Sequence, residues 1–296
     1  MGLNYYTARE VLRGRVGATL GAVATIGRLQ QFLLADQIAA LRAAHDLPAD
    51  GWAEQPFGGS ADGFFRAAGA SEISAIDASD YEGAAILHDM NVAIGPELER
   101  LFDLVVDGGS IEHIFRPDRA LANVMRMTKV GGRVLIWAPA NNQCGHGFYQ
   151  FSPEFFFSSL HEGTGFKIDR VLLVECVYPS VSLVAPRRAY VVRSPREVRE
   201  RVGVVSRRPL MLLVNAIKRA HVDDPFAVPP QQSDYEAQWS DRADARSSRL
   251  AGFASAAAVI ARRHPLGAAV AHHALGQSER RRFSLRNRSF FEPDRD

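Results

Sequence analysis

The sequence contains little cysteine and no long apolar run. Its 296 residues include only two cysteines, Cys144 and Cys176, which are too few for a disulfide framework or a cysteine-rich zinc site. This favours a reducing compartment, so we expect the protein in the cytoplasm. A membrane helix needs roughly 20 apolar residues, and arginines and a proline divide the best candidate, residues 250–276. We therefore expect no membrane span.

Several motifs that would fix a reaction are also missing. The chain has no G-x-S-x-G serine elbow and no phosphate-binding P-loop. His88, His113 and His146 lack the two-histidine helical spacing of a metalloprotease, so we expect no metal. The formal net charge is only +2, and the arginines of 187–208 and 280–288 come without a platform of stacking aromatic residues. We expect no nucleic-acid partner.

The most informative stretch is residues 102–151. It opens with a short β-branched run at 102–106, which an acidic residue and two glycines follow, as is typical of a buried parallel strand. A helical pattern begins near Pro117 and stops at another glycine pair, and residues 133–138 form a second strand. Strand, helix and strand make a βαβ unit, and such units cross over right-handedly in a parallel sheet.

The regions on both sides of this stretch add further elements to one sheet. Before it, strands are expected at 21–27, 72–77 and 85–87, and helices at 29–45 and 62–70. After it, a helix at 153–160 precedes two strands at 166–177 and 182–192. Because no helix fits between those two strands, they should pair as an antiparallel hairpin at one sheet edge.

The composition changes after Arg193, where basic residues become frequent. Three helices are expected in this last part, at 209–221, 233–261 and 267–275. We therefore divide the chain into an α/β domain at 1–193, with its core sheet at 18–193, and a helical, basic extension at 194–296. An oligomer could form through the helices of the extension.

Acidic residues and glycines follow several expected strands. Asp77, Asp89 and Asp107 come at or just after strand ends, where open α/β sheets bind ligands. An acid after the second strand commonly accepts hydrogen bonds from ribose hydroxyls; the alternative for Asp77 is a helix cap or a solvated loop. The first strand offers only Gly27, where a nucleotide site usually has several glycines. The later Gly58-Gly59 either folds back over the site or forms a plain surface loop.

Polar residues after the two central strands are candidates for chemistry. Glu112 or His113 can act as a general base or orient a substrate. His146 lies between two glycines, so a tight loop can bring its imidazole to a ligand, and Tyr149 follows closely. In each case the alternative is a side chain that only holds its own loop in place. The candidate catalytic residues are Glu112, His113, His146 and Tyr149.

Two longer segments carry a resemblance to class I S-adenosylmethionine-dependent methyltransferases. FDLVVDGGSIEHIF, a helix and MTKVGGRVLIWAPANN resemble the second half of that family's domain, and SEISAIDASDYEGAAILHDMN resembles its second and third strands. More narrowly, IDASDYEGA, DGGSIEHIF and GHGFYQFSPE resemble an uncharacterised methyltransferase-like group that is sometimes encoded beside glycan-modifying genes. The match covers roughly residues 23–192.

The resemblance implies a fold and a cofactor. The fold would be a Rossmann-like, doubly wound, mostly parallel α/β sheet with an antiparallel hairpin at one edge. The cofactor would be S-adenosylmethionine, with Asp77 on the ribose and Asp89 and Met90 beside the adenine. The cofactor-binding residues would be Gly27, Asp77, Ala78, Asp89, Met90, Asp107 and Gly108.

The function that this implies is methyl transfer to a small-molecule or glycan acceptor. The family's first glycine-rich motif is not present around Gly27. A second hypothesis is therefore a non-catalytic module of the same fold that has lost cofactor binding and acts by interaction. A third hypothesis, a nicotinamide-dependent reductase, is opposed by the expected hairpin and by the missing glycine fingerprint.

Overall fold

The structure is a computed structural model that describes residues 2–17, 19–48, 51–177, 180–235, 273 and 276–295. The helices expected at 233–261 and 267–275 lie almost wholly outside the described residues. Across the described ranges, no helix is both long enough and apolar enough to cross a membrane.

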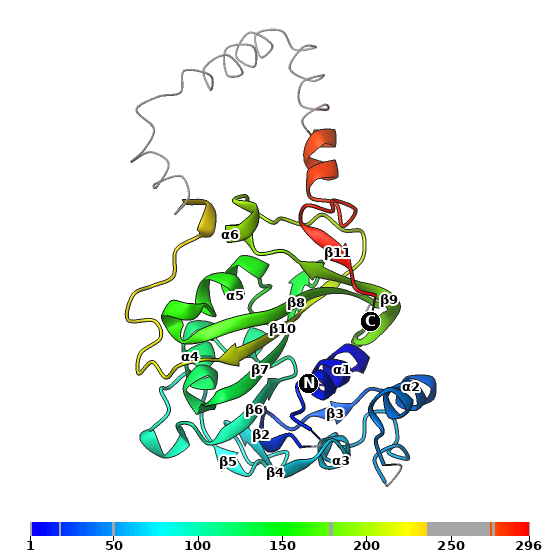
Figure 1. Cartoon of the computed structure of the whole chain (residues 1–296), viewed down its shortest axis with the longest axis vertical. Coiled ribbons are helices and arrows are strands. Elements are labelled where there is room, and N and C mark those ends of the chain that lie inside the picture. Colours follow the sequence, from blue (N-terminus) through cyan, green and yellow to red (C-terminus); the bar gives the residue numbers. More distant parts are fainter. Residues whose placement is uncertain are drawn as a thin grey trace.

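Helices and strands alternate up to β7, and most of the labelled elements after it are strands (Figure 1). The described strands are β1 (Gly2–Leu3), β2 (Gly21–Ile26), β3 (Gln30–Gln31), β4 (Ala70–Asp77), β5 (Ile86–Leu87), β6 (Phe102–Asp107), β7 (Thr128–Asn141), β8 (Phe166–Val177), β9 (Ser180–Val192), β10 (Leu210–Lys218) and β11 (Phe291–Pro293). The labelled α-helices are α1 (Tyr5–Arg13), α2 (Ala35–His45), α3 (Asp62–Ala67), α4 (Pro117–Met127), α5 (Pro153–Ser159) and α6 (Pro195–Val198), and residues 233–235 and 276–282 are also helical. Short 3-10 helices are η1 (Pro96–Leu98), η2 (Ile111–His113) and η3 (Glu162–Thr164).

One large sheet organises the molecule. In the described part of the chain it has nine strands, in the order β11-β9-β8-β10-β7-β6-β2-β4-β5. The strands from β5 to β7 pair in parallel. Strand β10 runs antiparallel to both of its neighbours, β7 and β8, and β9 runs antiparallel to β8 and β11. The expected Rossmann-like, doubly wound sheet with an antiparallel flank is confirmed.

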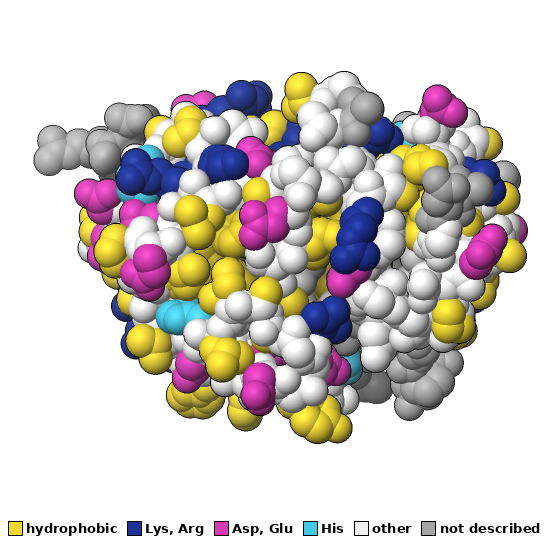
Figure 2. All heavy atoms as spheres, turned by 90° about the horizontal axis from the view of Figure 1, so that it is seen from below, with side chains coloured by type: hydrophobic (Ala, Val, Ile, Leu, Met, Phe, Trp, Pro, Cys, Tyr) yellow, Lys and Arg dark blue, Asp and Glu magenta, His cyan; other side chains and the backbone are white. Residues whose placement is uncertain are grey.

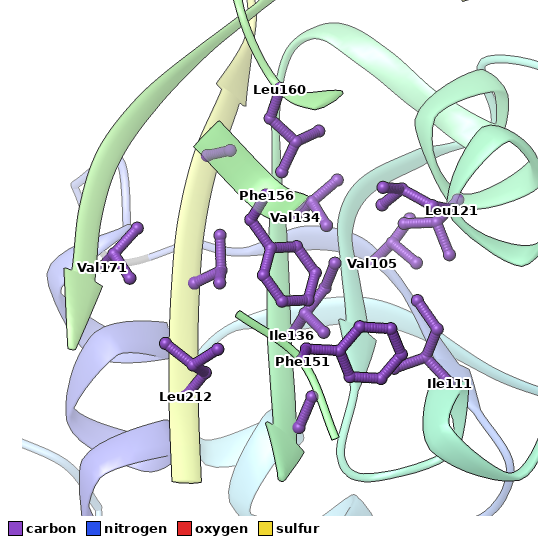
Figure 3. Packing of buried hydrophobic residues seen from close by; sticks show 14 of the residues in the cluster. Val105, Ile111, Leu121, Val134, Ile136, Phe151, Phe156, Leu160, Val171 and Leu212 are labelled. Carbon is purple, nitrogen blue, oxygen red and sulfur yellow. The ribbon is translucent and has the colours of Figure 1, made fainter. Parts of the chain in front are cut away.

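Helices cover both faces of this sheet because side chains alternate along its strands. On β6, Val105 belongs to the apolar cluster that includes residues of α4 and α5, whereas Leu104 and Val106 belong to the cluster that includes residues of α1, α2 and α3. Figure 3 shows Phe156 of α5 close to Ile136 of β7 in the first cluster. Burying one such large apolar side chain contributes about 1.5–3 kcal/mol.

Two of the expected motifs are confirmed. Strand β6, helix α4 and strand β7 form the βαβ unit, with Val105 paired to Val134 in the parallel register. Helix α4 starts on Pro117, whose fixed φ suits the first helical turn. The hairpin is formed by β8 and β9, which pair Leu172 with Val191.

The expectation of a helix at 209–221 is wrong, because that segment contains strand β10. Residues 210–214 are a continuous apolar run, and a short run of this kind cannot be assigned to helix or strand by periodicity alone. The place of this segment in the sheet makes it a strand, because β10 is hydrogen-bonded on both edges and its apolar residues are buried on both faces. The core sheet therefore does not end at residue 193, since β10 and β11 both belong to it.

The helix expected at 29–45 begins six residues late, at Ala35. The preceding segment is extended instead, and its strand β3 pairs in parallel with β1 at the start of the chain. Leu29 and Leu33 of this segment are buried in the cluster beneath α1 and α3. This extended segment lies directly after β2, so it shapes the carboxyl edge of the sheet.

A buried group of charges joins the two ends of the described chain. Arg9 of α1 contacts Asp294, and Arg170 Nη2 of β8 donates to Asp294 Oδ1 at 2.5 Å. Glu10 accepts from Asn215 Nδ2 of β10 at 3.1 Å and lies 3.4 Å from Arg170 Nη1. The side chains of Asp294 and Glu10 are each only 1% exposed. We call Arg9, Glu10, Arg170 and Asp294 the buried ionic cluster.

The surface seen from below in Figure 2 carries basic, acidic and apolar side chains mixed with one another.

Candidate functional site

The carboxyl ends of three parallel strands define the candidate site. Ile26 at the end of β2 pairs with Ile76 of β4 on one side and with Asp107 of β6 on the other. Neighbouring strands lie about 4.8 Å apart, so Asp77 and Asp107 lie on one edge, separated by the width of β2. The chain leaves β2 toward β4 and returns to β6 on the opposite side, which makes this edge a topological switch point where open α/β sheets bind ligands.

Strand β4 ends in the carboxylate of Asp77, which can accept further hydrogen bonds. Asp77 is half-buried, and its Oδ1 accepts a hydrogen bond from the Ser79 amide at 3.3 Å. Ala78 beside it is exposed. The carboxylate therefore has room for another donor, as a ribose-binding acid needs.

The acidic residue after strand β5, Asp89, is already hydrogen-bonded to its own loop. Asp89 is exposed, and its Oδ1 accepts from the amide and the side chain of Asn91 at 2.9 and 2.8 Å. These hydrogen bonds lower the pKa of the Asp89 carboxyl. The Met90 side chain is buried in the core cluster beneath α4. The cofactor roles of Asp89 and Met90 stay predictions.

The Asp107 carboxylate is turned into its own loop. Its Oδ1 accepts from the amides of Gly109 and Ser110 at 3.0 and 2.6 Å, and its Oδ2 accepts from Ile111 at 3.1 Å. Burial, reinforced by the nearby charge of Glu112, raises its pKa to about 7. Asp107 thus holds the turn into η2 in place, and its predicted contact with the cofactor stays a prediction.

The space above Gly108 is filled by the chain itself. The Gly2 amide donates to the Gly108 carbonyl at 2.9 Å. A Cβ atom at Gly108 would lie 2.6 Å from Leu29 Cδ2 and 3.3 Å from the Gly2 nitrogen. Gly27 has a φ of 72°, which favours glycine, but the next residues run into β3 and do not start a helix. A glycine loop facing a helix N-terminus is not formed after β2.

The Gly58-Gly59 loop does fold back onto this region. The Gly58 amide donates to the Gln31 carbonyl at 2.8 Å, and the Gln31 amide donates to the Gly59 carbonyl at 2.7 Å. The loop therefore lies against the segment that follows β2, and its predicted place over the site stays a prediction. Helix α3 starts directly after it and leads into β4.

Sequence reasoning missed Arg28. Its guanidinium donates from Nε to the Glu82 carbonyl at 2.8 Å and from Nη2 to the Gly83 carbonyl at 2.7 Å. Its Nη1 also lies 3.2 Å from Asp62 Oδ2. Arg28 therefore bridges the loop after β2 and the loop after β4. The available signal was an arginine directly after the glycine that ends the first strand.

The side chains of three candidate residues come together: Glu112, His113 and His146. The two histidines are separated by 32 residues in the sequence, 114–145. Glu112 is 0% exposed, and His146 Nε2 lies 3.4 Å from its Oε1. His113 Nε2 lies 4.0 Å from the same oxygen, and the two imidazole rings meet edge to face at 5.3 Å. Both histidines reach solvent, with 51% and 34% of the side chains of His113 and His146 exposed. We call these three residues the Glu-His-His group.

An aromatic rim borders the Glu-His-His group. The exposed rings of Phe115 and Phe148 meet edge to face at 5.8 Å, and Tyr149 lies next to Phe148 at 6.3 Å. The Tyr149 hydroxyl donates to the Phe115 carbonyl at 2.8 Å, so this hydroxyl already holds the rim together. Its predicted catalytic role stays a prediction.

A cavity of about 420 Å³ opens elsewhere, at the amino ends of the central strands. Its lining includes Gly21 before β2, Asp103 of β6 and Gly132 of β7. It therefore lies at the edge of the sheet opposite Asp77 and Asp107. Nothing in the predicted site lines it.

No protein-family model and no curated protein matches the sequence. Solved structures similar to the chain include a putative methyltransferase from Bacillus halodurans, 10% identical with a TM-score of 0.40 over 72% of this chain and 98% of that one. They also include a 1,6-didemethyltoxoflavin-N1-methyltransferase from Burkholderia thailandensis with bound S-adenosylhomocysteine, 14% identical with a TM-score of 0.38 over 73% and 78%. Another is the [4+2]-cyclase SpnF, 14% identical with a TM-score of 0.38 over 73% and 81%.

The fold is established by the strand order described above. The solved structures similar to the chain also include S-adenosylmethionine-dependent methyltransferases from Thermotoga maritima and Listeria monocytogenes, 12% and 14% identical with TM-scores of 0.35 and 0.37.

Proposed function

We propose that the protein is an S-adenosylmethionine-dependent methyltransferase that acts on a small-molecule or glycan acceptor. The observation that carries this proposal is the placement of Asp77. It ends the strand next to β2 at the switch point of the sheet, half-buried and with capacity for ribose hydroxyls. The reversed strand β10 between β7 and β8 is the second support, because the family that the sequence resembles has one antiparallel strand on this side of its sheet. Fold analogy alone does not assign a reaction.

The residues fit one half of the cofactor better than the other. Asp77 and exposed Ala78 suit the adenosyl half, with Asp89 nearby in sequence on the next loop. The methionyl half would lie toward Gly27 and Gly108, where Leu29 and Gly2 fill the space. Binding of the whole cofactor would therefore need this N-terminal segment to shift.

The cofactor supplies an electrophilic methyl group, and the chain's own residues have to align the acceptor with it. The exposed rings of Phe115 and Phe148 provide apolar surface for a small molecule or for the apolar face of a sugar. His146 next to the Glu112 carboxylate can take a proton from an acceptor hydroxyl, since the carboxylate stabilises the imidazolium that forms.

Calorimetry with S-adenosylmethionine and S-adenosylhomocysteine tests the proposal. We expect binding by the wild type and a loss of at least tenfold, about 1.4 kcal/mol, in Asp77→Ala, because ribose hydroxyls lose their acceptor. Asp80→Ala, an exposed acid in the same loop, is the matched control and should bind normally. No heat and no thermal shift at millimolar cofactor would refute the proposal.

A non-catalytic module is the second candidate, and the filled space above Gly108 favours it. The Leu29→Ala variant distinguishes a methyltransferase from a non-catalytic module. If the segment only covers a working site, the smaller side chain should tighten cofactor binding, even though truncating a buried leucine costs about 2–5 kcal/mol of stability. If wild type and Leu29→Ala both fail to bind, the interaction module remains.

A further inference from the structure

The Glu-His-His group has the composition of a metal site. Its three ligand atoms, one carboxylate oxygen and one nitrogen from each imidazole, all lie within 4.8 Å of one another. We propose that Glu112, His113 and His146 bind a divalent first-row transition-metal ion, with Zn²⁺ as the first candidate. The proposal goes beyond methyl transfer and does not rest on it, because metal uptake can be measured without cofactor or acceptor.

The first support is the burial of the Glu112 carboxylate without hydrogen bonds. The carboxylate is fully buried, and neither of its oxygens has a hydrogen-bond partner among the residues that the structure describes. An ionised carboxylate in this position loses its hydration and gains nothing from the backbone, which is strongly unfavourable unless a cation compensates. Among the described residues, the ion-pair partners within 4.0 Å of this carboxylate are the imidazoles of His113 and His146.

The second support is that both imidazoles approach the same oxygen. His146 Nε2 and His113 Nε2 lie 3.4 and 4.0 Å from Glu112 Oε1. The two ring centroids lie 5.3 Å apart, so both imidazoles border the same carboxylate oxygen. One metal ion would use all three groups together, the carboxylate and both imidazoles in their neutral form.

The distances suit an ion after small movements. Ligand bonds of 2.0–2.2 Å in a tetrahedral site place neighbouring ligand atoms about 3.3 Å apart. The Glu112 to His146 distance of 3.4 Å already meets this value. The His113 distance of 4.0 Å is slightly long, but this side chain is half-exposed and can rotate. A fourth position would face solvent, as in zinc sites that keep one place open for water or substrate.

The backbone holds the two halves of the group together. The Phe148 amide donates to the Glu112 carbonyl at 2.8 Å, and the His146 amide donates to the Gln143 carbonyl at 3.0 Å. Gly147 between them has a φ of 83°, and a Cβ there would lie 2.7 Å from the Glu112 carbonyl oxygen. The loop can pass this close to Glu112 only because glycine is present, and the contact brings the His146 side chain to the carboxylate.

The ligand types point to the kind of ion. Two imidazoles and one carboxylate suit Zn²⁺, Fe²⁺, Co²⁺ or Ni²⁺, whereas Mg²⁺ and Ca²⁺ prefer oxygen ligands throughout. An ion here would lie beside the aromatic rim. It could hold an acceptor oxygen directly and favour the loss of its proton, in place of the free His146 imidazole.

The test is metal uptake by the purified full chain. The apo protein is titrated by calorimetry with Zn²⁺ and Co²⁺, and Mg²⁺ is the control ion; bound metal is counted by elemental analysis after dialysis. We expect one ion per chain, visible absorption bands from Co²⁺, and a raised thermal midpoint with Zn²⁺. Glu112→Gln and His146→Ala should each weaken Zn²⁺ binding at least tenfold, since even partners that only orient ligands contribute about 10–100-fold.

Control variants test whether a loss of Zn²⁺ binding is specific to the Glu-His-His group. His88→Ala removes a histidine outside the group and should leave binding unchanged. Glu112→Gln without metal should be no less stable than the wild type, because a neutral amide replaces a buried carboxylate that accepts no hydrogen bond from the described residues. The proposal is overturned if the wild type binds none of these transition ions, if Glu112→Gln retains wild-type affinity, or if His88→Ala loses binding equally.

Discussion

Removal of the Asp294 side chain should destabilise the whole sheet. The buried ionic cluster contains two arginines and two acids, so its formal charges cancel. The side chains of Arg9, Arg170 and Asp294 are 6%, 15% and 1% exposed. Asp294→Ala leaves one uncompensated positive charge there, and breaking a buried pair in this way costs about 3–5 kcal/mol. The backbone is not involved, because the alanine variant keeps the amide that donates to the Ala189 carbonyl.

Denaturant unfolding measures this loss. We expect a lower midpoint with an unchanged slope, as for a pure stability change. Glu292→Ala, two positions earlier on β11 and exposed, is the control and should stay within about 0.5 kcal/mol. High salt should restore little stability, because buried charges are weakly screened.

A double variant separates charge imbalance from lost packing. Arg9→Met with Asp294→Leu leaves Arg170 paired with Glu10, so the formal charges cancel again. It should recover most of the stability that Asp294→Ala loses, because apolar replacement of a buried ion pair is often neutral or favourable. The reasoning is wrong if Asp294→Ala costs under 1 kcal/mol, about one third of the lower bound, or if the double variant is no more stable than the single one.

Two further predictions concern the core. Lys218 donates to the Met125 and Thr128 carbonyls, and burial lowers its pKa to about 8. The folded state therefore releases this proton at a lower pH than the unfolded state, so stability should rise by roughly 1–3 kcal/mol between pH 8 and 10.5. Lys218→Met should lose this rise when urea unfolding of both proteins is compared across that range. Phe156→Ala should cost about 3–5 kcal/mol by calorimetry, and loss of under 1 kcal/mol would contradict the packing in Figure 3.

Local sequence signals predicted the parallel half of the sheet well. The run at 102–106 is β-branched and closed by glycines, and Pro117 marks a helix start, so each segment indicates its own structure. Strand β10 was missed because a short leucine-rich run has no decisive period. Only the open place between β7 and β8 determines its conformation, and that place is a property of the whole fold.

The candidate site was predictable in part. The residue types were found, because Asp77 and Glu112 follow strand ends on one edge of the sheet. The convergence of His146 on Glu112 was not predictable, since it depends on a long-range backbone hydrogen bond from Phe148. The covering of Gly108 by Gly2 was also not predictable, because no spacing rule relates the start of a chain to a strand end.

The late position of β10 in the sequence has a consequence for synthesis. When the ribosome has made the chain only as far as β9, both β7 and β8 still lack the partner that will lie between them. Each then presents an unpaired row of backbone amides and carbonyls, which can recruit another nascent chain. The seventeen residues between β9 and β10 (193–209) must emerge before this gap can close. We therefore expect folding in cells to depend on chaperones that shield open strand edges during this interval.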